Sequence, residues 1–243
     1  GMALAPAEST DLLHDLYAFL GEEWVTVYGC CTHFVLAPIA NPELVEAWFL
    51  LGFGVEQVHA LLPLEPDALP SLPDLPGVEI RQAEPEDGER LASMSDVIWR
   101  HQVSAPVWGI MLPERVEQTR EGWRGLVREE DAVVFVAISE GDLIAAQAYY
   151  PAEPSEDNLV IPDHCIHFSV GGTRTEARGR GIQQALSATA LHWMRRHGYR
   201  VCETDWRSAN RSARTAWARH GYRPVLYRMA RRIDPRITWA RGL

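Results

Sequence analysis

The stretch Thr173-Arg-Thr-Glu-Ala-Arg-Gly-Arg-Gly-Ile182 follows an apolar run and opens an amphipathic helix. A glycine-rich turn between a strand and a helix leaves backbone N–H groups unpaired, and the positive end of the helix dipole adds to them. Glycines at 179 and 181 let a ligand approach the main chain where a Cβ would collide. The stretch therefore predicts a pyrophosphate-binding loop between a strand and a helix. A basic surface turn before an ordinary helix is the alternative.

A second motif, Asn210-Arg-Ser-Ala-Arg-Thr-Ala-Trp-Ala-Arg-His-Gly-Tyr222, predicts a short helix that ends at glycine and continues into a strand. Between the two motifs, Tyr199–Trp206 is predicted to be a strand. With these motifs, residues 77–232 resemble the GNAT superfamily of acyl-CoA-dependent N-acyltransferases. The matching positions are Arg178 and Gly181 in the first motif, and Asn210, Ala213, Gly221 and Tyr222 in the second. The chain departs from the family pattern at Gln183, where a small residue is usual, and at Trp217, where tyrosine is usual.

The resemblance implies an α/β fold. Its sheet is mixed and mostly antiparallel, splayed between the fourth and fifth strands and flanked by helices. The splayed strands correspond to Cys165–Thr173 and Tyr199–Trp206. Acetyl-CoA would lie between them as the acyl donor, and no metal is expected. The residues that would bind it are Gly171, Gly172, Thr173, Arg178, Gly179, Arg180, Gly181, Ile182, Gln183 and Asn210, with Trp217 packed against the pantetheine.

The candidate base lies on the strand that leads into the loop. Alternation along Cys165–Val170 predicts that Cys165, His167 and Ser169 share one face, turned toward the cleft, and that Ile166, Phe168 and Val170 share the other. His167 precedes Arg178 by eleven residues in the sequence, a separation at which the family often has a catalytic Glu or His. An imidazole side chain suits proton transfer. A histidine with satisfied hydrogen bonds on a half-buried strand is the alternative. Glu203 and Asp205 are fallback bases.

The group that protonates the leaving thiolate is not identified by the sequence. Trp217 stands at the position of the usual tyrosine, and an indole N–H is not acidic enough to donate this proton. Water or a nearby tyrosine, Tyr222 or Tyr227, would have to replace the usual tyrosine.

The first 65 residues contain a partial repeat. Asn41, Ala47, Trp48, Gly52 and Phe53 have the same spacing as Asn210, Ala216, Trp217, Gly221 and Tyr222. The expected organisation is a degenerate N-terminal half-GNAT unit at 1–65, a proline-rich linker at 66–76, a catalytic GNAT domain at 77–232 and a tail at 233–243. The half-unit has no counterpart of the glycine-rich loop, so we expect it to be structural. Chance similarity of two helix–glycine–strand units is the alternative.

Charge is distributed unevenly along the chain. Residues 1–76 hold eleven acidic side chains and no Arg or Lys, whereas residues 170–243 hold sixteen arginines against four acids. An arginine-rich segment suits a phosphate-bearing ligand. Nucleic acid is the rival partner, disfavoured because the rest of the chain is acidic and carries no nucleic-acid motif. No apolar run is long enough for a membrane span, no signal peptide is evident, and the four cysteines are expected to be reduced and buried, so we expect a cytoplasmic protein.

The leading functional hypothesis is an N-acetyltransferase that acts on a primary amine of a small molecule, an amino acid or a peptide. A non-catalytic module that binds or senses acyl-CoA is the alternative, favoured by Gln183 and Trp217. Neither nucleic acid nor membrane is expected as a partner. Whether the chain forms a homodimer is left open.

Overall fold

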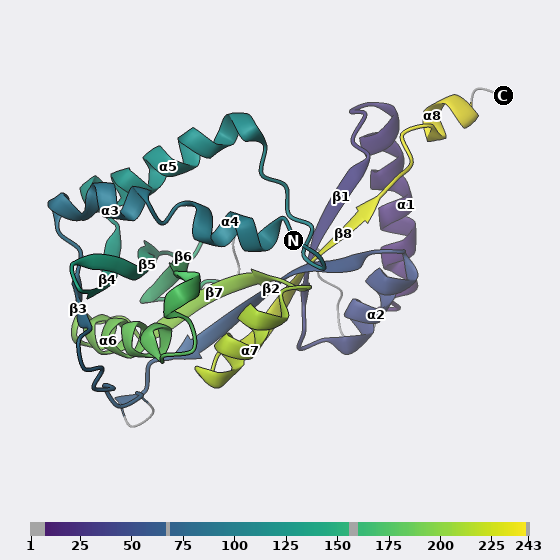
Figure 1. Cartoon of the computed structure of the whole chain (residues 1–243). Helices are drawn as coiled ribbons and strands as arrows, with labels where there is room; N and C mark the ends of the chain where they lie inside the picture. Colours follow the sequence, from purple (N-terminus) through teal and green to yellow (C-terminus); the bar gives the residue numbers. More distant parts are fainter. Residues whose placement is uncertain (1–7, 67–68, 156–159, 242–243) are drawn as a thin grey trace. The chain divides into compact units, whose positions relative to one another are not determined.

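The computed structural model describes residues 8–66, 69–155 and 160–241, in two compact units (Figure 1). The smaller unit comprises residues 1–60, 205–208 and 223–243, and the larger one comprises 61–204 and 209–222. The expected boundaries at 1–65, 66–76, 77–232 and 233–243 stay predictions. Residues 1–7, 67–68, 156–159 and 242–243 of those segments lie outside the described residues.

Eight strands hydrogen-bond in the order β1-β8-β2-β7-β6-β5-β4-β3. The strands of the larger unit are β3 (Glu79–Gln82), β4 (Val133–Ser139), β5 (Asp142–Ala152), β6 (Cys165–Thr173) and most of β7 (Val201–Arg207). Its helices are α3 (Gly88–Ala92), α4 (Asp96–Gln102), α5 (Val116–Gly125), α6 (Ile182–Arg196) and α7 (Arg211–Arg219). Neighbours from β3 to β6 are antiparallel, and β6 and β7 are parallel. The mixed, mostly antiparallel α/β sheet expected from the sequence is confirmed.

The core of the larger unit forms because β4 and β5 are apolar on both faces. Val134, Val136 and Ile138 alternate along β4 and pack against helix residues such as Leu91 and Trp123. In Figure 1, α3, α4 and α5 lie on one side of the sheet of the larger unit, and α6 and α7 lie on the other, with α6 against β4 and β5. Trp123 is therefore a core residue, in line with the usual role of buried tryptophan.

A bulge in β6 positions the candidate site. Along the β5–β6 pairing, Ala148 faces Val170 while Tyr149 faces Phe168, so Ser169 is the extra residue. This shift places Val170 on the same face as His167, against the α3–α5 core, so the simple alternation expected from the sequence is wrong beyond Phe168. Cys165 is also buried rather than turned toward a cleft.

The smaller unit is built from α1 (Asp11–Thr26), β1 (Thr32–Pro38), α2 (Pro42–Leu50), most of β2 (Gly54–Pro63), β8 (Arg223–Arg232) and α8 (Ile237–Ala240). β1 pairs with β8 over its whole length, from Thr32 opposite Arg232 to Pro38 opposite Leu226. α1 continues to Thr26, and β1 begins at Thr32. All four cysteines are free, and Cys30 is exposed rather than buried.

The two copies of the repeat have the same local structure. Asn41 caps α2 by accepting from the Leu44 amide at 3.1 Å, and Asn210 caps α7 by accepting from the Ala213 amide at 3.1 Å. Each helix then ends at a glycine in the left-handed region, Gly52 at φ +82° and Gly221 at φ +88°. The spacing in the sequence therefore reports a real structural repeat.

No helix among the described residues is long and apolar enough to cross a membrane.

Asp87 is expected to make a large pH-dependent contribution to stability. Its side chain is 2% exposed, accepts from the Glu84 amide at 2.9 Å and pairs with Arg81 at 2.6 Å. The bond from Arg81 holds the pKa of Asp87 below its usual value, so this stabilisation is present above pH about 4 and is lost as the pH falls through the lowered pKa. We expect Asp87→Asn to lower the free energy of unfolding by roughly 1–3 kcal/mol at neutral pH, measured by urea denaturation.

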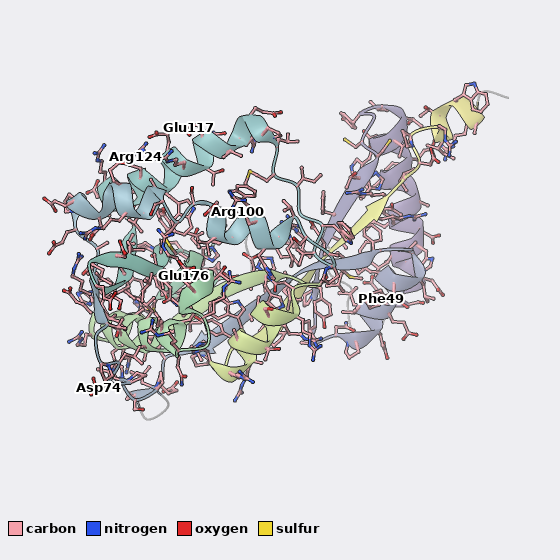
Figure 2. The ribbon with its side chains drawn as sticks, viewed as in Figure 1. Phe49, Asp74, Arg100, Glu117, Arg124 and Glu176 are labelled. Atoms are coloured by element: carbon pink, nitrogen blue, oxygen red, sulfur yellow. The ribbon has the colours of Figure 1, made fainter. Side chains whose placement is uncertain are left out.

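The matched control is Asp96→Asn, which removes an exposed pair with Arg100 on α4 (Figure 2). Exposed pairs contribute little, so we expect a change within about 0.5 kcal/mol. Equal losses in both variants would contradict the role assigned to Asp87.

Candidate functional site

The loop before α6 presents an open backbone cradle. Gly179 and Gly181 have φ angles of +76° and +78°, and a Cβ at either position would meet no atom within 4 Å. Gly181 is the N-cap of α6 and no side chain caps the helix. The first amides of α6 therefore lack helical partners and can bind an anion.

If the loop binds the CoA that the family resemblance implies, replacing Gly181 by alanine should weaken that binding by roughly tenfold or more, because the new Cβ would stand where the ligand approaches the amides. The matched control is Gly198→Ala at the other end of α6. Gly198 has φ +88° and equally open surroundings, so both variants carry the same backbone strain of about 1 kcal/mol. Isothermal titration with CoA should separate them, and equal affinities would contradict the cradle.

A cavity of about 300 Å³ extends from this loop to α7. Its lining residues include Thr173, Arg178, Gly179, Gly181, Ile182, Gln183 and His220. Burial lowers the pKa of His220, which keeps that imidazole neutral near neutral pH. The positive groups of the cavity are therefore Arg178 and Arg219 together with the helix end.

A second cavity, of about 270 Å³, lies between β6, α4 and the start of α7. Its lining includes Gly171, Gly172, Thr173, Arg178 and Asn210. β6 and β7 are paired only from Cys165 opposite Val201 to Phe168 opposite Thr204. The strands thus separate where the family resemblance implies, although Gly171 and Gly172 also have a packing role. A Cβ at Gly172 would lie 2.9 Å from Val97, and one at Gly171 would lie 2.7 Å from Phe168.

The structure brings most of the expected ligand-binding residues to these cavities. Arg178 donates from Nε to the Thr173 carbonyl at 3.2 Å, and Thr173 donates from Oγ1 to Gln183 at 2.8 Å. Gln183 therefore spans to the end of β6 in the place where the family has a small residue. Arg180 is exposed and lines neither cavity.

Asn210 and Trp217 occupy different parts of α7. The side-chain oxygen of Asn210 is used as the helix cap, which leaves its amide NH₂ as the donor at the cavity wall. Trp217 lines neither cavity and packs edge-on against Phe168, with ring centroids 4.7 Å apart.

His167 and Glu203 form a direct pair on adjacent strands. They face each other in the β6–β7 register, and Nδ1 of His167 bonds to the Glu203 carboxylate. The histidine side chain is 31% exposed and the carboxylate side chain is 3% exposed. With an ionised Glu203, Nδ1 carries the proton and Nε2 carries the basic lone pair. This arrangement orients an imidazole for proton transfer.

The other two candidate catalytic residues bond elsewhere. Asp205 accepts a hydrogen bond from the Gln57 side chain within the smaller unit. Tyr222 is buried and donates to Sγ of Cys202 at 3.0 Å, and burial raises its pKa well above the usual value. Because this bond to Cys202 uses the Tyr222 hydroxyl, Tyr222 serves the core of the larger unit.

The helix α4 contributes residues that sequence reasoning did not assign to the site. Val97, Ile98 and Gln102 line the second cavity beside His101. The glycine pair at 171–172 was the available signal, because adjacent glycines in a strand mark a close approach of another element. No group of His, Cys, Asp or Glu that could hold a metal ion occurs within 8–66, 69–155 and 160–241.

Solved structures with the same fold confirm the architecture. A GCN5-related N-acetyltransferase from Sphaerobacter thermophilus is 17% identical with a TM-score of 0.57, and the match covers 92% of this chain and 69% of that one. A tandem GNAT protein from the clavulanic acid biosynthesis pathway is 14% identical with a TM-score of 0.57, over 95% and 73% of the two chains. A GCN5-related N-acetyltransferase from Kribbella flavida is 18% identical with a TM-score of 0.52, over 98% and 80%.

Comparison with curated proteins gave no match. The family model described as the acetyltransferase (GNAT) family matches residues 97–222, which include the cradle, both cavities and the His167–Glu203 pair. Since this match spans more than half of the sequence, the chain belongs to the GNAT acetyltransferase family.

Proposed function

We propose that this protein transfers an acetyl group from acetyl-CoA to a primary amine of a small molecule, an amino acid or a peptide. The observation that carries the proposal is the His167–Glu203 pair, whose histidine lies on β6 while the other end of that strand lines the second cavity. Family membership supports acyl-CoA as the donor. The pair supports catalysis over binding alone.

The proposed binding mode follows the two cavities. The amides from Gly179 to Gln183 would hold the pyrophosphate, with Arg178 at the junction of both cavities. The pantetheine arm would run along Gly171, Gly172 and Thr173, and the Asn210 amide would donate to one of its carbonyls. The bulge at Ser169 frees backbone groups next to His167, which suits a polarised thioester carbonyl.

The proposed chemistry assigns proton removal to His167. Nε2 would take a proton from the incoming amine, and Glu203 would stabilise the imidazolium that forms. Removing that proton exposes the nitrogen lone pair for attack on the thioester carbonyl. Asp205, bonded to Gln57, is not needed as a base in this scheme.

A module that binds acyl-CoA without turnover is the second candidate. The buried hydrogen bond of Tyr222 favours it, because this hydroxyl already donates to Cys202 and is not offered to a ligand as a general acid.

The discriminating experiment measures CoA thiol release from acetyl-CoA with a panel of polyamines, amino acids and short peptides, alongside calorimetric binding of CoA. Amine-dependent release supports the transferase. Tight CoA binding with no release across the panel supports the binding module. Failure to bind CoA would contradict both proposals.

A further inference from the structure

The hydroxyl of Thr204 is buried where β6 and β7 begin to separate. Thr204 is 0% exposed, and its partner in the strand register is Phe168, the last pair before the strands diverge. No hydrogen-bond partner for its Oγ1 exists within the part of the chain that the structure describes. Burying a hydroxyl without a partner costs free energy, so the position calls for a partner that comes with a ligand.

The side chain of Thr204 lies on the α7 side of the sheet. Residues paired in a parallel register project to the same face, so Thr204 shares the face of Phe168. The Phe168 ring packs against Trp217 on α7, with ring centroids 4.7 Å apart. Thr204 therefore lies at the closed end of the space between the strands, next to the face on which α7 packs.

Neighbouring buried hydroxyls already have partners in the protein. Tyr222 donates to Sγ of Cys202, two residues before Thr204 on the same face of β7. The buried Gln147, Tyr149 and Ser187 bond to one another, with distances of 2.6 and 2.9 Å. Thr204 differs from these groups because its hydroxyl has no protein partner among the described residues.

We propose that Thr204 donates a hydrogen bond to the sulfur of the CoA leaving group. The inference rests on the proposed acetyltransferase activity. The amine nitrogen forms a bond to the thioester carbon, the carbon–sulfur bond breaks, and its electron pair goes to sulfur. His167 takes the amine proton, and the thiolate takes a proton from water as CoA leaves. Thr204 transfers no proton and acts by stabilising the developing negative charge.

The test compares Thr204→Val with Thr204→Ser. Valine has nearly the same shape without the hydroxyl, so kcat should fall about tenfold while the KM for acetyl-CoA stays unchanged. Serine keeps the donor and should retain most of the activity. Because the lost hydroxyl had no partner, the valine variant should melt at the same temperature as the parent protein or higher.

The matched control is Ser187→Ala. This variant also removes a buried hydroxyl, but one that accepts from Gln147 at 2.9 Å. Leaving Gln147 unpaired should lower the melting temperature without changing kcat. The two variants thus separate a structural hydroxyl from a hydroxyl kept for the reaction.

A binding measurement tests the same contact without turnover. The CoA thiol is titrated while CoA is bound to the protein, and its ionisation is monitored by the ultraviolet absorbance of the thiolate. In the parent protein ionisation should occur at lower pH than in Thr204→Val. Unchanged ionisation and an unchanged kcat in Thr204→Val would overturn the inference while leaving the acetyltransferase proposal intact. A parent protein that binds CoA but transfers nothing would refute the transferase, and the thiol titration would still decide the contact.

Discussion

Replacing His167 by alanine is expected to lower kcat by about 100- to 1,000-fold, the usual contribution of a positioned general base. CoA affinity should stay unchanged, because His167 lines neither cavity next to the glycine-rich loop. The acidic limb of the kcat/KM profile should disappear with the imidazole. Steady-state kinetics over a range of pH, with the best amine from the panel, would measure both effects.

Glu203→Gln supplies the second arm of this experiment. The amide keeps the shape of a side chain that is 3% exposed, but it cannot stabilise the imidazolium. A smaller loss of kcat than in His167→Ala is expected, together with a shifted pH profile. His192→Ala removes another half-buried histidine, which bonds to the Pro70 carbonyl at 2.9 Å, and should leave kcat unchanged. A fully active His167→Ala protein would exclude His167 as the base.

The sequence predicted the local structure of the glycine-rich loop and of the α7 cap more completely than the contacts of the candidate catalytic residues. Loop glycines and helix caps are local features, so Gly179, Gly181 and Asn210 take the expected conformations. The partners of polar side chains depend on the register of neighbouring strands. The pair between His167 and Glu203 could not be derived without knowing that β6 and β7 are parallel at that register.

The bulge at Ser169 shows a second limit. One extra residue in β6 reverses the face of each later side chain, and no glycine or proline marks the position. Tyr222 likewise could not be separated from the site by sequence reasoning. Its hydroxyl donates a hydrogen bond to Cys202 on β7, and a contact between residues so far apart in the sequence cannot be predicted from a local sequence pattern.

The repeat could be read from the sequence, but its pairing could not. Spacing predicted the two capped helices and their terminal glycines. The structure adds that β1 of the first copy pairs with β8, which follows the helix of the second copy. Contact between these distant segments buries Met229 among residues of α1, β1 and α2. Residues 223–232, which the sequence groups with 77–222, therefore share a core with the N-terminal segment.

That shared core makes Trp48→Ala the variant with the largest expected effect on stability. Trp48 is 2% exposed on α2 and packs edge-on against Tyr17 and Phe53, with ring centroids 6.1 and 5.1 Å apart. Deleting a buried tryptophan of this kind costs about 3–5 kcal/mol. Chemical denaturation followed by far-ultraviolet circular dichroism should show this loss in the smaller unit.

Phe49→Ala is the matched control, because the neighbouring aromatic on the same helix is 48% exposed (Figure 2). Its loss should change stability by no more than about 0.5 kcal/mol. Below the unfolding transition, Trp48→Ala should bind CoA as tightly as the parent protein, since every residue lining the two cavities belongs to the larger unit. Weaker CoA binding by the folded Trp48→Ala protein would show that the N-terminal segment affects the site. Equal stability of Trp48→Ala and Phe49→Ala would show that the shared core does not stabilise the smaller unit.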